Sequence, residues 1–223
     1  MSTLYICGTP IGNLSDISKR LIDVLQKVDR IVAEDTRQTL KLLQHLQIHK
    51  PMVSFFRHNI RRRIPELLEY LRNGENLALV TDAGMPGISD PGPELVEAVA
   101  KEGFSIECIP GPSAVTAALA ISGFPADQFV FLGFLPVKSG KRKKILTDIS
   151  GESRTVVFFE SPHRIAKTLK ELGEILPDRS VVVCRELTKK FETIYRGRGS
   201  EILEKIPPAS IRGEFTVVIG PLD

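Results

Sequence analysis

The strongest constraint on the fold is a regular alternation of short apolar runs with amphipathic segments through the first half of the chain. Val-, Ile- and Leu-rich runs of strand length lie at 3–9, 30–35, 52–56, 77–83 and 105–110. Segments with the apolar spacing of helices lie between them, at 15–27, 36–46, 62–73 and 91–102. Because strands joined by crossover helices form a parallel sheet, this half is predicted to be an α/β domain.

Two of these segments show the pattern most clearly. The run 77–83 is apolar at every position until Thr81 and Asp82, as expected of a central parallel strand covered on both faces. The segment 15–27 is predicted to be a helix with Ser15 as its N-cap. It places four apolar residues on one face, namely Ile17, Leu21, Val24 and Leu25.

The pattern changes after PGPSA (110–114). A small-residue helix is predicted at 113–123, followed by strands at 129–135, 155–160 and 181–187 and helices at 138–149 and 162–173. The last apolar runs, at 191–199 and 214–220, have no full crossover helix, which favours a mixed sheet. We therefore expect two α/β domains, 1–113 and 114–223, with a boundary near 111–123.

Composition places the chain among ordinary globular proteins, with 223 residues of which 42% are hydrophobic and 26% charged. No signal peptide or membrane-spanning run is visible, so a cytoplasmic protein is expected. The three cysteines, Cys7, Cys108 and Cys184, each lie in an apolar run and are expected to be buried thiols. Their spacing indicates no metal site.

The net charge of +3 is mild, but the positive charge is concentrated in two runs. One is RHNIRRR, with Arg57, Arg61, Arg62 and Arg63. The other is KSGKRKK, with Lys138, Lys141, Arg142, Lys143 and Lys144. Both are candidate contacts for nucleic-acid phosphates, and a solvated charged face is the alternative.

Three Gly/Pro-rich loops follow predicted parallel strands and should meet at one edge of the sheet, where open α/β sheets bind ligands. They are GTPIGN (8–13), VTDAGMPGISDPG (80–92) and PGPSA (110–114). Neither a P-loop nor a strand-linked G-x-G-x-x-G motif is present. A tight turn without a ligand is the alternative for each loop alone.

Further motifs extend this pattern through the rest of the chain, including AEDTR (33–37), IPGPSA (109–114), GFLP (133–136), FFESPHRI (158–165), RELTK (185–189) and RGEFTVVI (212–219). Together with the loops above, they occur in the same order in one family. The chain closely resembles the rRNA cytidine 2′-O-methyltransferase branch of the tetrapyrrole (corrin/porphyrin) methylase superfamily. The resemblance covers essentially the whole chain. Members usually continue into a small helical extension, whereas this sequence stops at Asp223.

The resemblance implies a two-domain α/β fold with a mostly parallel sheet in the N-terminal domain and a mixed sheet in the C-terminal domain. It also implies a homodimer, a substrate in 16S rRNA of the small ribosomal subunit, and S-adenosylmethionine bound in a cleft between the domains. By the same carry-over, the cofactor contacts are Pro10, Gly84, Met85, Pro86, Gly87, Ile88, Ser113, Ala114, Glu160 and Leu187.

Methyl transfer to a ribose hydroxyl is helped by a base and by a cation near the developing alkoxide. The candidate bases are Glu34, Asp35, Glu160 and His163. The candidate cations are Arg37, Arg164 and Arg185. Each has an ordinary alternative: a capping or solvated strand-end charge for the EDTR group, a surface imidazole after Pro162 at a helix start, and an Arg185–Glu186 pair.

Two other functions remain open. The first is methylation of a tetrapyrrole, which needs no RNA contacts. The second is a non-catalytic, ribosome-associated RNA-binding module in which the loops are only structural.

Overall fold

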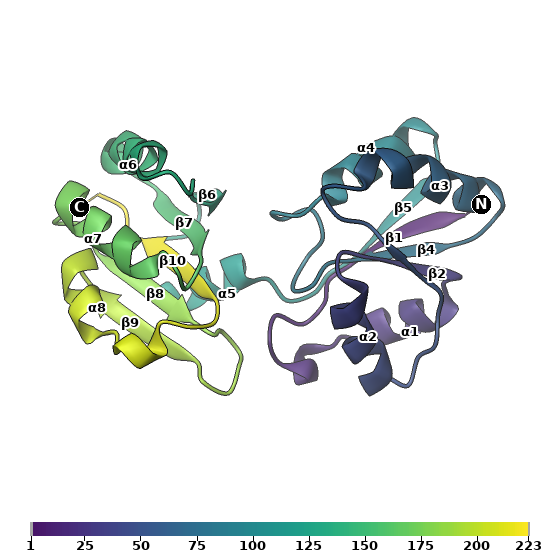
Figure 1. Cartoon of the computed structure of the whole chain (residues 1–223), viewed down its shortest axis with the longest axis horizontal. Helices are drawn as coiled ribbons and strands as arrows, with labels where there is room; N and C mark the ends of the chain where they lie inside the picture. Colours follow the sequence, from purple (N-terminus) through teal and green to yellow (C-terminus); the bar gives the residue numbers. More distant parts are fainter. Residues whose placement is uncertain (1, 223) are drawn as a thin grey trace. The chain divides into compact units, whose positions relative to one another are not determined.

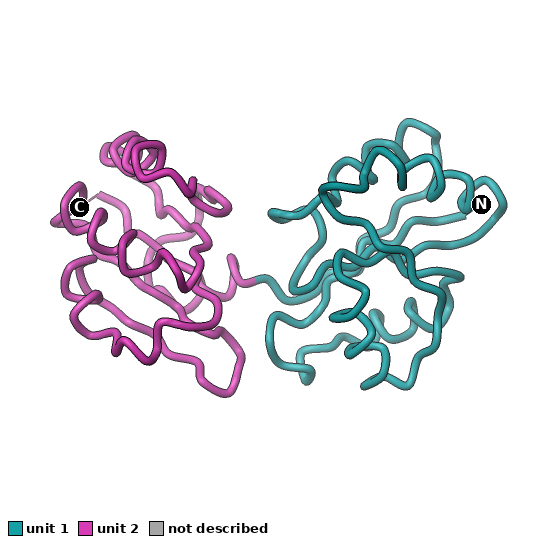
Figure 2. Tube along the Cα trace, in the orientation of Figure 1, with its two compact units in different colours: residues 1–113 teal, residues 114–223 magenta. Residues whose placement is uncertain are grey.

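The computed structural model describes residues 2–222, and the chain forms two compact units, Met1–Ser113 and Ala114–Asp223 (Figure 2). Each unit contains its own five-stranded sheet. The predicted α/β fold class, with a parallel sheet in the first half and a mixed sheet in the second, is confirmed.

The first unit is a parallel α/β structure (Figure 1). Its sheet has the order β3-β2-β4-β1-β5, and every pair is parallel. The strands are β1 (Thr3–Cys7), β2 (Arg30–Ala33), β3 (Met52–Ser54), β4 (Leu77–Val80) and β5 (Ser105–Ile109). The helices are α1 (Lys19–Lys27), α2 (Thr36–His45), α3 (Ile60–Arg72) and α4 (Gly92–Lys101).

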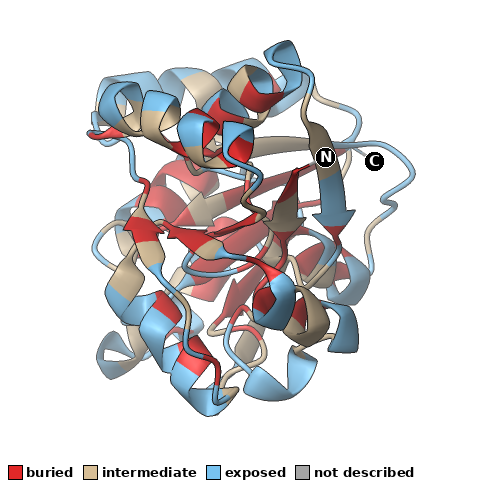
Figure 3. Cartoon of the chain, turned by 90° about the vertical axis from the view of Figure 1, so that its right-hand side faces the viewer, coloured by how far each residue is buried: buried red, intermediate tan, exposed pale blue. Residues whose placement is uncertain are grey.

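Helices cover both faces of this sheet, and alternate residues of β4 face the two layers. Leu77 and Leu79 belong to the cluster that includes residues of α3 and α4, whereas Ala78 and Val80 belong to the cluster with α1 and α2. Figure 3 shows the buried residues gathered in the strands and on the inward sides of the helices. This two-sided burial explains why the sequence of β4 is apolar without alternation.

The start of α1 differs from the prediction. Ser18, and not Ser15, is the N-cap, because its hydroxyl accepts a hydrogen bond from Leu21 N at 3.1 Å. A separate 3₁₀ turn, Leu14–Asp16, precedes it, and there Ser15 N donates to the side chain of Asn13. Both sites carry N-cap residue types, so local sequence alone did not separate the turn from the helix.

The second unit contains a mixed sheet of order β6-β7-β10-β8-β9, in which only the β6–β7 pair is parallel. Residues of α6, α7 and α8 share its main core, and α5 packs against β7 and β10. The strands are β6 (Phe129–Phe134), β7 (Thr155–Glu160), β8 (Val181–Arg185), β9 (Thr193–Gly197) and β10 (Phe215–Ile219). The helices are α5 (Ala114–Ser122), α6 (Ser139–Asp148), α7 (Ile165–Ile175) and α8 (Gly199–Lys205).

Two details of this unit correct the sequence analysis. Helix α7 begins at Ile165 rather than 162, because residues 162–164 form a turn in which Ser161 O accepts from Arg164 N and Ile165 N. Pro162 is therefore not a first helical residue. The short helix α8 was not predicted, since its seven residues are too few for a clear 3.6-residue period.

The cysteines are buried at two of the three positions. Burial raises the pKa of Cys7 and of Cys184 to about 12, which makes both thiols unreactive. Cys108 is exposed, contrary to expectation, because it lies on the edge strand β5.

Within residues 2–222, no helix combines the length and apolar character needed to span a membrane.

Candidate active site

The candidate site of the first unit lies at the carboxyl edge of its sheet. Because the five strands are parallel, the segments that follow them all emerge at this edge. The structure brings the three predicted Gly/Pro loops together there. Thr9 N donates to Gly84 O at 2.9 Å and Gly84 N donates to Thr9 O at 3.1 Å, while Gly8 N donates to Ile109 O at 2.9 Å.

The backbones of the loops after β1 and β5 approach each other closely. A Cβ atom added at Gly8 would lie 2.7 Å from Gly111 Cα, and one added at Gly111 would lie 2.6 Å from Gly8 O. No side chain fits at either position without moving backbone. These two glycines were not among the predicted site residues, although both lie in the Gly/Pro motifs that marked the loops.

The loop after β4 is shaped by Asp90, a residue that the sequence analysis did not single out. Its carboxylate accepts hydrogen bonds from Gly87 N at 2.9 Å, from Ile88 N at 3.2 Å and from Gly92 N at 2.7 Å. Gly84 and Gly87 have φ angles of +86° and +95°, which favour glycine. The Asp-Pro-Gly sequence at a helix start was the available signal.

An acidic group stands beside these loops. Glu34 accepts a hydrogen bond from the Thr81 hydroxyl at 2.5 Å, and Asp82 accepts one from Asp35 N at 3.0 Å. Asp35 is the N-cap of α2 and forms an ion pair with Arg37 at 2.7 Å. Asp82 was missed as a site residue, although it directly follows the predicted central strand.

The carboxyls of this group differ in proton affinity. Hydrogen bonds from Arg37 lower the pKa of Asp35 to about 2, so Asp35 is a weak proton acceptor. Desolvation of its carboxylate raises the pKa of Asp82, the hydrogen bond from Asp35 N lowers it, and the negative charges of Glu34 and Asp35 raise it again, so that the pKa lies above its ordinary value. Asp82 is therefore the carboxylate of this group whose raised proton affinity suits a general base.

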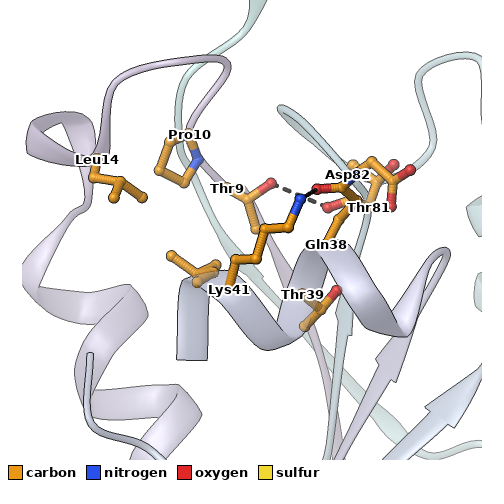
Figure 4. Close-up of a pocket in the computed structure, with 9 residues that line it drawn as sticks. Thr9, Pro10, Leu14, Gln38, Thr39, Lys41, Thr81 and Asp82 are labelled. Carbon is orange, nitrogen blue, oxygen red and sulfur yellow. Dashed lines mark hydrogen bonds between the residues drawn. The ribbon is translucent and has the colours of Figure 1, made fainter. Parts of the chain in front are cut away.

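A pocket of about 160 Å³ opens next to Asp82 (Figure 4). Figure 4 shows Lys41 extending from α2 across the pocket, and its Nζ donates a hydrogen bond to Gln38 Oε1 at 2.9 Å. Ligand pockets usually measure about 300–1,000 Å³, so this pocket has room for part of a ligand. Its lining residues are Thr9, Pro10, Leu14, Gln38, Thr39, Lys41, Leu42, Thr81 and Asp82.

In the second unit, two predicted residues, Glu160 at the end of β7 and Arg164 just before α7, contact each other. Glu160 is 1% exposed and accepts hydrogen bonds from Ser161 N at 2.8 Å and from the Thr168 hydroxyl at 2.7 Å. Arg164 forms an ion pair with it at 2.7 Å and donates to Leu135 O. The carboxylate of Glu160 is thus occupied by protein donors, which makes it a poor candidate for a base.

Other predicted residues of this unit include His163, Arg185 and Leu187. His163 is exposed, and Leu187 is buried between two residues with positive φ, Glu186 at +52° and Thr188 at +64°. The suggested Arg185–Glu186 pair is wrong. Arg185 donates to two backbone carbonyls, and Glu186 pairs with Lys189 at 3.0 Å.

The two basic runs differ in how far their side chains are exposed to solvent. Arg57, Arg61 and Arg62 are exposed, which suits contact with a polyanion. Arg142 is 1% exposed and forms a bidentate pair with Glu171, at 2.6 and 2.8 Å, so its assignment to a nucleic-acid contact is wrong. A run of basic residues in the sequence does not show which of its side chains faces the core once the run forms a helix.

Among residues 2–222, no group of three or more His, Cys, Asp or Glu could hold a metal ion.

Residues 3–203 match the family model of the tetrapyrrole (corrin/porphyrin) methylases. The chain belongs to this family. The resemblance drawn from the motifs is confirmed, and the tetrapyrrole methylase family is one of S-adenosylmethionine-dependent methyltransferases.

Relatives within the tetrapyrrole methylase family are similar over nearly the whole chain. A Thermotoga maritima protein named ribosomal RNA small subunit methyltransferase I is 47% identical over 98% of both chains. Proteins of the same name from Synechocystis and Bacillus subtilis are 47% and 44% identical over 98% of this chain, and over 79% and 75% of their own lengths.

Solved structures show the same fold at much lower identity. A cobalt precorrin-4 methyltransferase is 22% identical with a TM-score of 0.72, covering 98% of this chain and 94% of its own. A diphthine synthase is 17% identical with a TM-score of 0.76, covering 98% and 90%. A Thermus thermophilus uroporphyrin-III C-methyltransferase complexed with S-adenosylhomocysteine is 16% identical with a TM-score of 0.68, covering 98% and 97%.

Proposed function

We propose that this chain transfers a methyl group from S-adenosylmethionine to the ribose 2′-oxygen of a cytidine in 16S rRNA of the small ribosomal subunit. The observation that carries the proposal is the 47% identity to the Thermotoga maritima small subunit rRNA methyltransferase over 98% of both chains. The tetrapyrrole methyltransferases of known structure are only 16–22% identical. As part of the same proposal, the protein acts in the cytoplasm as a homodimer.

The proposed cofactor site includes the loop after β4, with Gly84, Met85, Pro86, Gly87 and Ile88. A Cβ added at Gly87 would have no atom within 4 Å, so the backbone there is open to a ligand. Pro10 lines the adjacent pocket. These features fit a cofactor that lies against uncovered backbone. The contacts expected at Ser113, Ala114, Glu160 and Leu187 stay predictions.

Gly87→Val is expected to weaken S-adenosylmethionine binding by about tenfold or more, because a branched side chain fills the open side of the loop and opposes its positive φ. Titration calorimetry measures the effect. Gly74→Val is the matched control, since Gly74 has a φ of +87° and open space but lies before β4, at the other edge of the sheet. Equal affinity in the two variants contradicts the proposed site.

When bound, the cofactor supplies an electrophilic methyl group for an in-line displacement, so the protein must orient the hydroxyl and receive its proton. We propose Asp82 as the proton acceptor. Its raised pKa, its place after the central strand and its position beside the pocket support this role. The charge of Glu34 assists by raising that pKa, whereas the hydrogen bond from Asp35 N opposes the rise, and Arg37 keeps Asp35 ionised at the start of α2.

Mass spectrometry of 16S rRNA nucleosides, from cells with and without this protein, tests the proposed function. Loss of one 2′-O-methylcytidine in cells without the protein is the expected result. Transfer of labelled methyl to uroporphyrinogen but not to ribosomal subunits favours the tetrapyrrole alternative. An absence of S-adenosylmethionine binding in calorimetry favours the non-catalytic RNA-binding module.

The exposed basic residues are expected to bind rRNA phosphates. Substituting Arg57, Arg61 or Arg62 with Gln should lower the slope of log affinity against log salt by about 0.7–1 per residue, because each phosphate contact releases counterions. The same holds for Lys138, Lys141 and Lys144. Filter binding at several salt concentrations measures the slope. Lys101→Gln is the control, since Lys101 is exposed but pairs with Glu97, and an unchanged slope in all six variants rejects both runs.

A further inference from the structure

We propose that Phe56 is a stacking surface for one unpaired base of the RNA substrate, at the centre of a patch formed by Phe56, Arg57, His58, Arg61 and Arg62. We call these five residues the β3–α3 patch. The inference rests on the proposed RNA substrate and adds to it a specific recognition element outside the cofactor loops.

The first argument is the exposure of an aromatic ring next to a buried one. Phe56 is 40% exposed, whereas the preceding Phe55 is 1% exposed and belongs to the core beneath α3 and α4. The His58 ring lies edge-on to Phe56 with centroids 6.4 Å apart. Exposure of one Phe is ordinary by itself, but a ring beside several cations offers both a face for base stacking and partners for the adjoining phosphates.

The second argument is that Phe56 is held in place rather than mobile. Asn59, which is 8% exposed, accepts a hydrogen bond from Phe56 N at 2.9 Å and donates to Ser54 O at 3.0 Å. Its amide therefore clamps the turn between β3 and α3 from inside. Because this bond holds the backbone of Phe56 while Phe55 is buried in the core, less backbone freedom is lost when a ligand binds the ring.

The third argument is the state of the neighbouring charges. The side chains of Arg57, Arg61 and Arg62 form no ion pair or hydrogen bond within residues 2–222. The next residue, Arg63, pairs with Glu66 at 2.6 Å and is half-buried. These three exposed guanidinium groups are free to pair with an external polyanion, although the charge of Arg62 also acts on Glu66 and lowers its pKa.

The fourth argument is position. Phe55 N donates to Ala33 O at 2.7 Å, which joins the start of the patch to the end of β2, where Glu34 and Asp35 follow. The patch and the acidic group with Asp82 thus lie at the same edge of one sheet, one or two strands apart. A strand of RNA that crosses this edge can contact both.

An exposed ring beside unpaired arginines fits single-stranded RNA better than a duplex. Bases in a duplex stack on each other and offer no face to a protein ring, whereas an unpaired base can stack on Phe. Arginine side chains can contact phosphates without an aromatic ring nearby, so phosphate contacts alone do not account for the exposed Phe56. The ring therefore indicates that one nucleotide near the methylated position is unpaired when the RNA is bound.

A single tryptophan tests the proposal, because the chain contains none. In Phe56→Trp, fluorescence is expected to be quenched by a short single-stranded RNA with the cytidine-containing 16S rRNA sequence, and not by the same sequence in a duplex. Phe129→Trp is the matched control, since Phe129 is 39% exposed but lies in the second unit, two residues after the acidic Asp127. Equal quenching by duplex, or equal quenching in the control, overturns the proposal.

Affinity measurements separate stacking from charge. Phe56→Ala should weaken binding of the single strand by about tenfold without changing the salt slope, and Phe56→Tyr should restore the affinity. Arg61→Gln should instead lower the slope. Unchanged affinity in Phe56→Ala overturns the proposal. The proposed function is tested separately. If the unsubstituted protein transfers no methyl group to ribosomal subunits, the proposed function is rejected, whatever the fluorescence of the Phe56→Trp variant shows.

Discussion

Asp82→Asn is expected to lower kcat for methyl transfer to ribosomal subunits by about 10²–10⁴-fold, the usual contribution of a general base. Asn keeps an oxygen that can accept the hydrogen bond from Asp35 N, so the fold around β2 and β4 should remain intact. The amide cannot receive the proton of the ribose hydroxyl. Single-turnover methyl transfer at saturating cofactor measures the loss.

The pH dependence gives an independent test of the same role. Because the pKa of Asp82 is raised above its ordinary value of 3.8, activity of the unsubstituted protein should fall as pH drops through that raised pKa. In Asp82→Asn, this fall in activity at low pH, the acidic limb of the pH profile, should be absent. Asp16→Asn, an exposed carboxyl in the 3₁₀ turn, should keep both the rate and the limb. A full rate in Asp82→Asn excludes Asp82 as the base.

Arg142→Ala is expected to destabilise the second unit by about 3–5 kcal/mol, because Glu171 is left as a buried carboxylate without its partner. Burial raises the pKa of Glu171, but hydrogen bonds from Arg142 and Ser139 hold it below its ordinary value. Without Arg142, burial dominates and the pKa rises. The loss of stability should therefore be largest at neutral pH and smaller in acid, where Glu171 is protonated. Urea unfolding measures it.

Two comparisons sharpen this prediction. Lys143→Ala breaks the neighbouring pair with Glu174, whose side chains are both 47% exposed, and should cost less than about 1 kcal/mol. The double substitution Arg142→Met with Glu171→Leu removes both buried charges and should recover most of the stability. If Arg142→Ala and Lys143→Ala lower the free energy of unfolding equally, burial of the Arg142–Glu171 pair is not what makes it important for stability.

Much of the fold could be predicted because long-range burial left a regular pattern in the sequence. The central strand β4 is apolar throughout since helices cover both of its faces, and α1 carries its buried residues Leu21 and Leu25 at helical spacing. The pattern is weaker where local and tertiary signals compete. Ser15 and Ser18 are both good caps, and only the structure shows which one begins the helix.

The candidate site was harder to predict in its details. Motifs identified the loops but not Asp90, whose role depends on three backbone N–H groups turning toward one carboxylate. They grouped Arg142 with exposed lysines, because charge alone does not reveal a buried partner 29 residues away in the sequence. Proton affinities depend on distances between strands, so Asp82 could be recognised only after the sheet placed it beside Glu34 and Asp35.

The internal bonding of the loop after β4 determines which charge the loop can attract. Four of its N–H groups, those of Gly84, Gly87, Ile88 and Gly92, donate to protein oxygens, and Pro86 and Pro91 have none. A Gly-rich loop that binds phosphate works in the opposite way, since it points its free donors at the anion. In this loop these four donors are already engaged, three of them with the carboxylate of Asp90, whose negative charge lies close by. If the loop forms the proposed cofactor site, this arrangement suits a positively charged sulfonium better than a nucleotide phosphate.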